Sequence, residues 1–312
     1  MSFSSEVKRE LASVEPDSRD GKYAELYGMA LFSGRFSNRE IVFKTENRYS
    51  ASRFERLLSE LFNPIIEKKS DLKLNTDSRG LYRISVLMSE DCKRIFEDFG
   101  HSPRDIKLRI NRANIADESL YASFLRGVFL SCGSVTDPDK GYHLELNVQR
   151  RALAENLVHL IGEIEVFSSK PKLSLRNGSS VIYYKDNDGI CEFLGYIGAG
   201  NAVMKLLAAS AYKETMNLLN RRMNSELANI KKTSDASARQ IHAIKKIMKR
   251  DGIKSLPAEL RELAALRLDN PDMSLKELGE SFDPPISRSG VNHRLQKLLK
   301  LAETSDKECP KN

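Results

Sequence analysis

The segment SRSGVNHRLQKLLK, residues 287–300, carries the side chains best suited to contact another molecule. If this segment is helical, Val291, Leu295 and Leu298 fall in one narrow sector and form a packed face. The remaining surface is rich in amide and basic groups, which can bond adenine edges, guanine edges and phosphates. The predicted contact residues are Ser287, Arg288, Ser289, Asn292, His293, Arg294, Gln296, Lys297 and Lys300.

The residues before this segment predict the elements that would position it. Ser274 and Glu277 have the spacing of a capping box, so a short helix should begin there, with Leu278 and Phe282 pointing inward. Two consecutive prolines then turn the chain into the second helix. A short helix, a turn and a helix with a polar outer face form the helix-turn-helix plan, predicted here over residues 274–307. A plain solvated helix is the alternative interpretation.

Charge is distributed unevenly along the chain. Residues 1–200 contain 29 basic and 29 acidic residues, whereas residues 201–312 contain 21 basic and 14 acidic residues. The whole net charge of +7 therefore belongs to the C-terminal third. Such asymmetry favours a polyanionic partner, most commonly nucleic acid, over a basic surface that is merely solvated. Double-stranded DNA is the expected partner.

Other classes of function lack the residues they need. No apolar run approaches the roughly 18 residues of a membrane span, and the N-terminus lacks the apolar core of a signal peptide. The N-terminal segment instead predicts an amphipathic helix beginning after Ser4 or Ser5, and a cytoplasmic protein without a membrane partner. The four cysteines form no CxxC pair and should be free thiols. Because HExxH and phosphate-binding glycine motifs are also missing, we expect no metal and no cofactor.

The first two thirds of the chain contain a duplication. LYGMALFSGRF, residues 26–36, aligns with LRGVFLSCGSV, residues 125–135, at a displacement of 99 residues. This predicts repeats at about 20–100 and 119–199, each with the order helix, strand, helix, strand, strand, helix. After the repeated helix, the expected elements are 39–46, 50–62, 71–76, 81–88 and 92–100 in the first copy, and 141–148, 152–161, 170–177, 180–187 and 190–198 in the second.

Four glycines occupy matching positions in the two copies, Gly28 with Gly127 and Gly34 with Gly133. A glycine inside a helix costs about 1 kcal/mol relative to alanine. A close approach of two backbones, or a C-cap role for Gly34 and Gly133, should compensate for this cost. The two repeated helices are therefore expected to pack on each other about a pseudo-two-fold axis.

LYGMALFSG and LRGVFLSCG resemble the LAGLIDADG motif of homing endonucleases. The resemblance implies an α+β saddle made of two repeats, and it places the metal-binding acids of that family at Ser33 and Cys132. Neither residue supplies the carboxylate that Mg²⁺ prefers, so two-metal cleavage would lack its ligands. Asp137 and Asp139 lie in a DPDKG turn, which they are expected to cap. The resemblance therefore implies that the two repeated helices still pack against each other and that the protein is not an enzyme.

SLKELGESFDPPISRSGVNHRLQKL, together with RRMNSELANIKKT and SARQIHAI, resembles the WhiA family of bacterial regulators, and the likeness covers nearly the whole chain. The chain departs from that family at Ser225-Glu226, where Cys-Asp is common. The resemblance implies a sequence-specific transcriptional regulator involved in cell division, chromosome segregation and, in sporulating relatives, sporulation. It also implies association with the nucleoid, with another transcription factor or division proteins as candidate partners.

The C-terminal third otherwise shows helical patterns. One helix or a broken pair is predicted over residues 203–233, with a joint in TSDAS near residue 235. The next helix, residues 237–252, should bury Ile241, Ile244 and Met248, and a further helix follows in LPAELRELAALRL. The predicted fold is thus an α+β duplicated LAGLIDADG-like saddle followed by an all-α helix-turn-helix domain. Its predicted parts are 1–200 (saddle), 201–234 (helical linker), 235–304 (helix-turn-helix domain) and 305–312 (tail).

Two alternative functions remain open from the sequence. One is residual nuclease activity in which Asp137, Asp139 or Glu25 recruits metal in place of the lost acids. The other is an interaction scaffold for the division machinery, in which the helix-turn-helix mainly docks the protein on the nucleoid.

Overall fold

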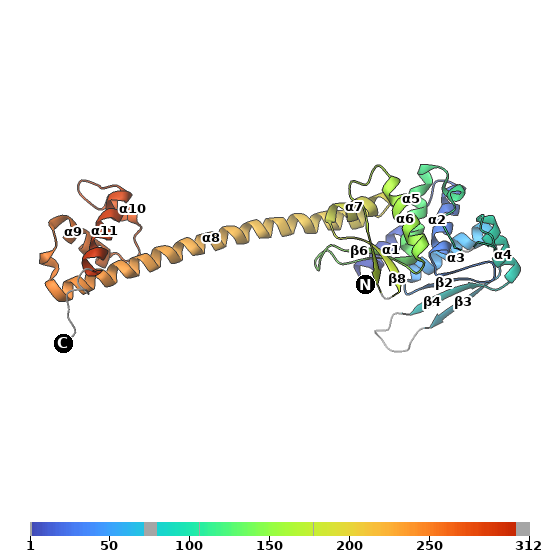
Figure 1. The fold of residues 1–312 in the computed structure, drawn as a ribbon, viewed down its shortest axis with the longest axis horizontal. Helices are drawn as coiled ribbons and strands as arrows, with labels where there is room; N and C mark the ends of the chain where they lie inside the picture. The colour runs from blue at the N-terminus through green and yellow to red at the C-terminus, as the bar shows by residue number, and fades with distance from the viewer. Residues whose placement is uncertain (1, 72–79, 106, 177, 304–312) are drawn as a thin grey trace. The chain divides into compact units, whose positions relative to one another are not determined.

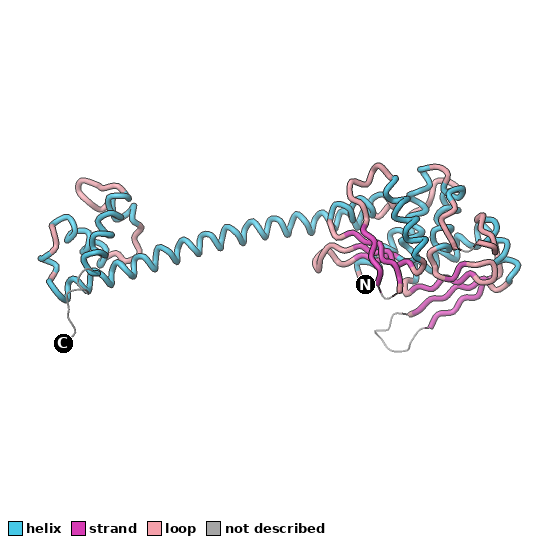
Figure 2. The backbone as a smooth tube through the Cα atoms, in the orientation of Figure 1, coloured by secondary structure: helices cyan, strands magenta, loops and turns pink. Residues whose placement is uncertain are grey.

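The chain folds into two compact units, Met1–Lys213 and Glu214–Asn312, each with its own hydrophobic core. Figures 1 and 2 show the helices and strands of both units. The structure is a computed structural model that describes residues 2–71, 80–105, 107–176 and 178–303.

The first unit begins with α1 (Phe3–Ser13), which Ser2 caps, so this helix starts slightly earlier than the sequence indicates. Two repeats follow, with α2 and α5 as the repeated helices. The first repeat contains α2 (Arg19–Leu31), β1 (Arg35–Phe36), β2 (Ile41–Thr45), α3 (Arg48–Phe62), β3 (Ile66–Asp71), β4 (Leu81–Val86) and α4 (Ser89–Asp98). After the short 3₁₀ turns η1 (Arg112–Ile115) and η2 (Glu118–Leu120), the second contains α5 (Tyr121–Cys132), β5 (Gly133–Val135), β6 (Leu144–Val148), α6 (Arg151–Glu163), β7 (Lys172–Arg176), β8 (Ser179–Tyr184) and α7 (Asn187–Tyr196).

The two repeats have the same sheet topology, which confirms the duplicated α+β fold. Both sheets are antiparallel and four-stranded within the described residues, with strand orders β1-β2-β4-β3 and β5-β6-β8-β7. The short strands β1 and β5 extend the predicted order of elements. The predicted strand at 71–76 is displaced: β3 ends at Asp71, and residues 72–76 lie outside the described residues. In β2, Val42 is buried beside Ile41 and Phe43, although simple alternation predicts that it faces solvent.

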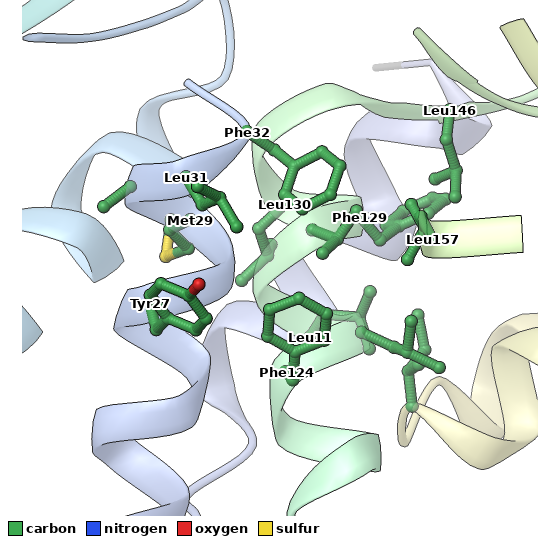
Figure 3. Close-up of a cluster of buried hydrophobic side chains, with 14 of the residues drawn as sticks. Leu11, Tyr27, Met29, Leu31, Phe32, Phe124, Phe129, Leu130, Leu146 and Leu157 are labelled. Atoms are coloured by element: carbon green, nitrogen blue, oxygen red, sulfur yellow. The ribbon is translucent and has the colours of Figure 1, made fainter. Parts of the chain in front are cut away.

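The repeated helices α2 and α5 pack against each other as the glycine pattern predicts (Figure 1). A methyl group added to Gly28 would overlap the carbonyl oxygen of Phe124, and one added to Gly127 would overlap that of Glu25. Both glycines are therefore needed because two backbones meet there. Figure 3 shows the buried side chains around this contact, where the rings of Tyr27 and Phe124 lie 5.7 Å apart.

The other two glycines behave differently from one another. Gly34 follows the end of α2 with a left-handed φ of 86°, as a glycine near a helix C-terminus often does. Gly133 is the C-cap residue of α5, which confirms the C-cap role predicted for it, and its backbone there is extended rather than left-handed. A side chain at Gly133 would instead overlap the ring of Phe129.

The helix α8 (Gly200–Asp251) is continuous, so the predicted joint near residue 235 is wrong. Its interior contains no glycine or proline, and the Ser, Thr and Asp residues of TSDAS disfavour a helix only weakly. In the last turns of α8, Ala243, Ile244 and Ile247 are buried. Of the residues predicted to be buried here, Ile244 is buried and Ile241 is half-buried, whereas Met248 is exposed because Ile247 packs into the core instead.

The second unit begins within α8, at Glu214, and its described residues continue into further α-helices (Figure 1). After the 3₁₀ turn η3 (Ile253–Ser255) come α9 (Ala258–Asp269), α10 (Leu275–Glu280) and α11 (Arg288–Glu303). Leu260 and Leu263 of α9, Leu278 of α10 and Leu295 of α11 meet in its core. This confirms the predicted all-α helix-turn-helix architecture. No described helix combines the length and the apolar character required to cross a membrane.

Candidate nucleic-acid interface

The helix α10 and the turn after it position the second helix of the motif. The predicted capping box is present, because the Ser274 and Glu277 side chains each bond the other residue's backbone amide. Leu278 and Phe282 are buried, as predicted. The amide of Ile286 donates to the carbonyl of Gly279 at 2.9 Å, and a side chain on Gly279 would overlap the carbonyl oxygen of Ile286. Gly279 therefore sets the approach of the turn to α10, a role that its sequence context did not reveal.

Ser287 caps α11, which begins at Arg288, because its hydroxyl accepts a hydrogen bond of 3.2 Å from the amide of Gly290. Val291, Leu295 and Leu298 are buried in the core of the second unit, which confirms the predicted packed face. The opposite side of α11 is consequently turned outward. The orientation of the candidate contact residues follows from this burial.

Most of the candidate contact residues form two rows along α11. Arg288, Asn292 and Gln296, spaced four apart, make one exposed row, and a second exposed row lies beside it. Residues four apart are separated by about one helical turn, so each row runs along the helix axis. Such a row can follow the wall of a DNA groove or the sugar-phosphate backbone. The second row consists of Ser289, His293 and Lys297, with the exposed Lys300 near its end.

Arg294 has different surroundings from the other candidate contact residues. Its side chain is 23% exposed, its guanidinium lies 5.5 Å from the centre of the Phe282 ring, and Nη2 is 3.7 Å from Oε2 of Glu259. A guanidinium over an aromatic face is attracted by the ring quadrupole. Arg294 therefore joins α11 to the rest of the unit in addition to any contact it makes with a ligand.

The row of Arg288, Asn292 and Gln296 lines a hollow of about 520 Å³ in the second unit. We call this the basic hollow. Its other walls come from α8, the end of α9 and the start of α10, and they carry the basic side chains Lys232, Arg239, Arg267 and Lys276. Sequence reasoning did not identify these four residues as part of one site. Their positions in three separate helices share no local spacing that would have revealed it.

Ser33 and Cys132, which the sequence resemblance aligns with the metal-binding acids of homing endonucleases, bond to their own helices. The hydroxyl of Ser33 donates to the carbonyl of Ala30 at 2.8 Å, and the thiol of Cys132 donates to that of Val128 at 3.4 Å. Burial raises the pKa of Cys132 to about 12, so its thiol stays protonated and neutral at neutral pH. Neither group presents an anion to a divalent cation.

Lysine side chains lie close to the second of these positions. Lys8 and Lys44 line a hollow of about 690 Å³ together with Cys132. The ammonium group of Lys8 donates to the carbonyl of Leu130 at 3.4 Å. Burial lowers the pKa of Lys8 to about 8, so this group is still mostly protonated at neutral pH. Glu46 lines the same hollow, so two ammonium groups and one carboxylate surround it. The resulting positive charge disfavours a divalent cation.

Two of the three carboxylates proposed for residual nuclease activity, those of Glu25 and Asp137, bond to other groups of the protein. Glu25 is fully buried and receives hydrogen bonds of 2.7 and 2.9 Å from Nε and Nη2 of Arg53. Arg126 lies 3.6 Å from the same carboxylate. Asp137 accepts the amide of Asp139 at 3.0 Å, which confirms its predicted role in the turn. Within the described residues no group of three or more His, Cys, Asp or Glu side chains is arranged to hold a metal ion.

The cysteine prediction agrees with the described part of the chain. Cys92, Cys132 and Cys191 are free thiols. Cys309 lies outside the described residues.

Two family models match the chain. The model of the WhiA C-terminal HTH domain matches residues 219–302, and that of the WhiA LAGLIDADG-like domain matches residues 121–217. These ranges contain the helix-turn-helix of the second unit and the second repeat of the first unit. The models thus independently identify both architectures.

Full-length relatives and a solved structure extend the likeness to nearly the whole chain. A probable cell division protein WhiA of Clostridium beijerinckii is 36% identical over 316 residues, covering 97% of this chain and 98% of the relative. That of Alkaliphilus metalliredigens is 37% identical over 317 residues, with the same coverage. The crystal structure of full-length DUF199/WhiA from Thermatoga maritima matches with a TM-score of 0.60 at 28% identity, covering 97% of this chain and 99% of that chain.

Proposed function

Because this chain belongs to the WhiA family, we propose that it is a sequence-specific DNA-binding regulator of cell division without nuclease activity. Relatives of this chain are named probable cell division proteins, and the matched helix-turn-helix domain suggests DNA binding. The proposal extends to chromosome segregation, to sporulation in sporulating relatives and to association with the nucleoid. It includes no cofactor.

The observation that carries the proposal is the exposed polar side of α11 above a packed apolar face. We assign Asn292 and Gln296 to base edges, since their amides can form paired hydrogen bonds with adenine. Lys297 and Lys300, farther along the helix, suit phosphate contacts. The first turn of α11, at Arg288 and Ser289, is the part expected to enter the major groove. The remaining candidates, Ser287, His293 and Arg294, flank these positions.

A comparison of specific and non-specific affinity tests this assignment. Chromosomal occupancy mapping of the intact protein supplies target duplexes, and fluorescence anisotropy then measures binding to a target and to a scrambled duplex. Asn292→Ala combined with Gln296→Ala should lower the ratio of the two affinities by at least about tenfold, because each base-edge contact contributes about 1–3 kcal/mol. An unchanged ratio would show that these amides do not read sequence.

The matched control changes two exposed amides of α8 that lie outside the basic hollow, Asn217→Ala and Asn224→Ala. This control should leave both affinities near those of the original chain. If the control and the α11 variant lose the same discrimination, the loss comes from a general effect on the second unit, and the assignment to α11 is wrong.

The proposed lack of nuclease activity rests on the side chains at the former acid positions. Ser33 and protonated Cys132 offer no anionic ligand, and lysines line the second position. Incubation of supercoiled plasmid with the protein and Mg²⁺ or Mn²⁺ should give no nicking above a protein-free control. Robust nicking that disappears in Asp137→Ala would establish the nuclease alternative instead.

A further inference from the structure

The basic hollow has an unusual charge for a depression in a protein surface. Five basic side chains line it, and its described lining contains no Asp or Glu. Lys276 lies 3.7 Å from Glu280, but both side chains are largely exposed, so this pair neutralises little of the charge. The five basic residues are Lys232, Arg239, Arg267, Lys276 and Arg288. A concave surface of one charge sign attracts ions of the opposite sign.

Arg267 supplies the strongest reason to expect an anion there. Its side chain is only 2% exposed, and its Nη1 donates to the carbonyls of Met273 at 2.7 Å and Pro271 at 3.4 Å. Its Nε has no hydrogen-bond partner, and no carboxylate pairs with this guanidinium among the described residues. A buried charge without a counter-ion is costly. An anion in the adjoining hollow would compensate this charge.

Gln240 is the second polar side chain that lines the hollow without complete bonding. It is 6% exposed, and its Oε1 has no hydrogen-bond partner in the described structure. The oxygen and nitrogen of a glutamine amide exchange places by a rotation of the terminal group. After that rotation Gln240 presents its NH₂ group, which is a donor to an anionic oxygen.

The position of the hollow identifies the anion. Arg288, Asn292 and Gln296 of the proposed recognition helix line it, so an anion there lies next to the side chains assigned to base edges. In duplex DNA the groups next to a groove edge are backbone phosphates, which Arg, Lys and amide groups commonly contact. We infer that the basic hollow is a phosphate-binding site that holds a backbone phosphate of the DNA bound by α11. This inference rests on the proposed function and makes α8 part of the DNA-binding surface.

The first test removes the two exposed basic side chains that α8 contributes. In the full-length chain, Lys232→Gln with Arg239→Gln should lower the slope of log Kobs against log salt by about one, because about 0.9 counterion is released per phosphate contact and the hollow holds one phosphate. The matched control is Lys245→Gln with Lys249→Gln, which removes the same charge from exposed positions of α8 outside the hollow. The control should change the slope by much less. Equal changes in the two variants would overturn the assignment of the hollow.

The second test asks whether the hollow takes a phosphate without DNA. Inorganic pyrophosphate is titrated calorimetrically into the full-length chain, with sodium chloride of equal ionic strength as the reference. One pyrophosphate should bind per chain, and the Lys232, Arg239 double variant should weaken this binding at least tenfold. Absence of saturable binding, or binding that the double variant leaves unchanged, would contradict a phosphate site.

The two tests together separate this inference from the proposed function. Loss of pyrophosphate binding together with a reduced DNA salt slope supports the inference in full. If pyrophosphate binds at the hollow but the DNA salt slope is unaffected by the double variant, the site serves a free phosphate compound and the DNA assignment is wrong. If the original chain binds no duplex while pyrophosphate binding persists, the proposed function fails although the phosphate site remains.

Discussion

Arg288 and Arg294 are six residues apart on α11 and meet different surroundings. Arg288 is exposed at the first turn of α11 and lines the basic hollow. Arg294 lies over the Phe282 ring and near Glu259. Arg288 is therefore placed mainly to contact a ligand, whereas Arg294 also contributes to the packing of the second unit.

Substitution of these two arginines should separate the two contributions. Arg288→Ala should reduce the salt slope of DNA binding by about one and leave the melting temperature nearly unchanged. Arg294→Ala should reduce the slope similarly and also lower the stability of the second unit by about 1 kcal/mol, because it loses the contact with Phe282. Anisotropy over a series of salt concentrations and thermal unfolding followed by circular dichroism measure the two effects. An unchanged slope in both variants would reject their role as phosphate contacts.

Lys8 provides a pH-dependent prediction at the residue scale. Its pKa is about 8 in the folded chain and about 10.5 when it is solvated, so folding opposes its charged form. Lys8→Met should therefore stabilise the first unit at pH 7, and the advantage should shrink as the pH rises from about 8 towards 10.5. Urea denaturation of both proteins at pH 7 and pH 10 measures this difference. Buried tyrosines and cysteines also titrate at high pH in both proteins. The quantity compared at each pH is therefore the difference in the free energy of unfolding between the variant and the original chain.

At the scale of elements, the contact of α2 with α5 depends on the missing side chains of Gly28 and Gly127. Each glycine lets the backbone carbonyl of the other helix come closer than a Cβ atom would permit. The buried Glu25 and Arg53 pair stands beside this contact. The packing of the two repeats therefore has little tolerance for added volume.

Replacement of Gly127 by alanine should destabilise the first unit by at least about 1–3 kcal/mol, because the new methyl group would overlap the Glu25 carbonyl. The matched control is Gly162→Ala in α6, where no heavy atom lies near the added Cβ. That change should stabilise the helix by about 0.5–1 kcal/mol. Chemical denaturation followed by circular dichroism measures both. If the two changes have the same sign, the close approach of α2 and α5 is not essential.

At the scale of the whole molecule, the two units have separate hydrophobic cores and different net charge. Among the described residues, the core of the second unit is formed by residues from Ala243 onward. The net charge is +5 for residues 214–312 and +2 for residues 1–213. A unit with its own core can fold independently. We therefore expect DNA affinity to reside in the second unit.

A fragment comprising residues 214–312 should fold cooperatively and bind the same duplexes as the full chain, within about tenfold in affinity, or about 1.4 kcal/mol. Circular dichroism and anisotropy measure folding and binding. A fragment that folds but loses more than this factor would show that the first unit contributes to DNA binding. A fragment starting at residue 241, which lacks Lys232 and Arg239, should bind more weakly if it folds.

The repeats and the helix-turn-helix were predictable because they depend on local patterns. Two glycines per repeat, the capping box at Ser274 and the apolar spacing of α11 each act over a few residues. The break expected near residue 235 was wrong, because the low helix propensity of Ser, Thr and Asp does not interrupt a helix whose interior lacks glycine and proline. At the end of α8 the prediction was right for Ile244 and wrong for Met248, since packing partners rather than spacing alone select the buried face and Ile247 is buried instead.

The sequence by itself determined the duplication and the polar outer side of α11, because residue type and short-range periodicity are enough for these. It also showed that Ser33 and Cys132 stand where the resemblance to homing endonucleases places acids. Only the tertiary structure decided that Gly279 meets the turn before α11 and that Arg294 packs on Phe282. It alone brought Lys232, Arg267 and Arg288 around one hollow. Side chains from separate helices meet only through packing, and packing leaves no local spacing in the sequence.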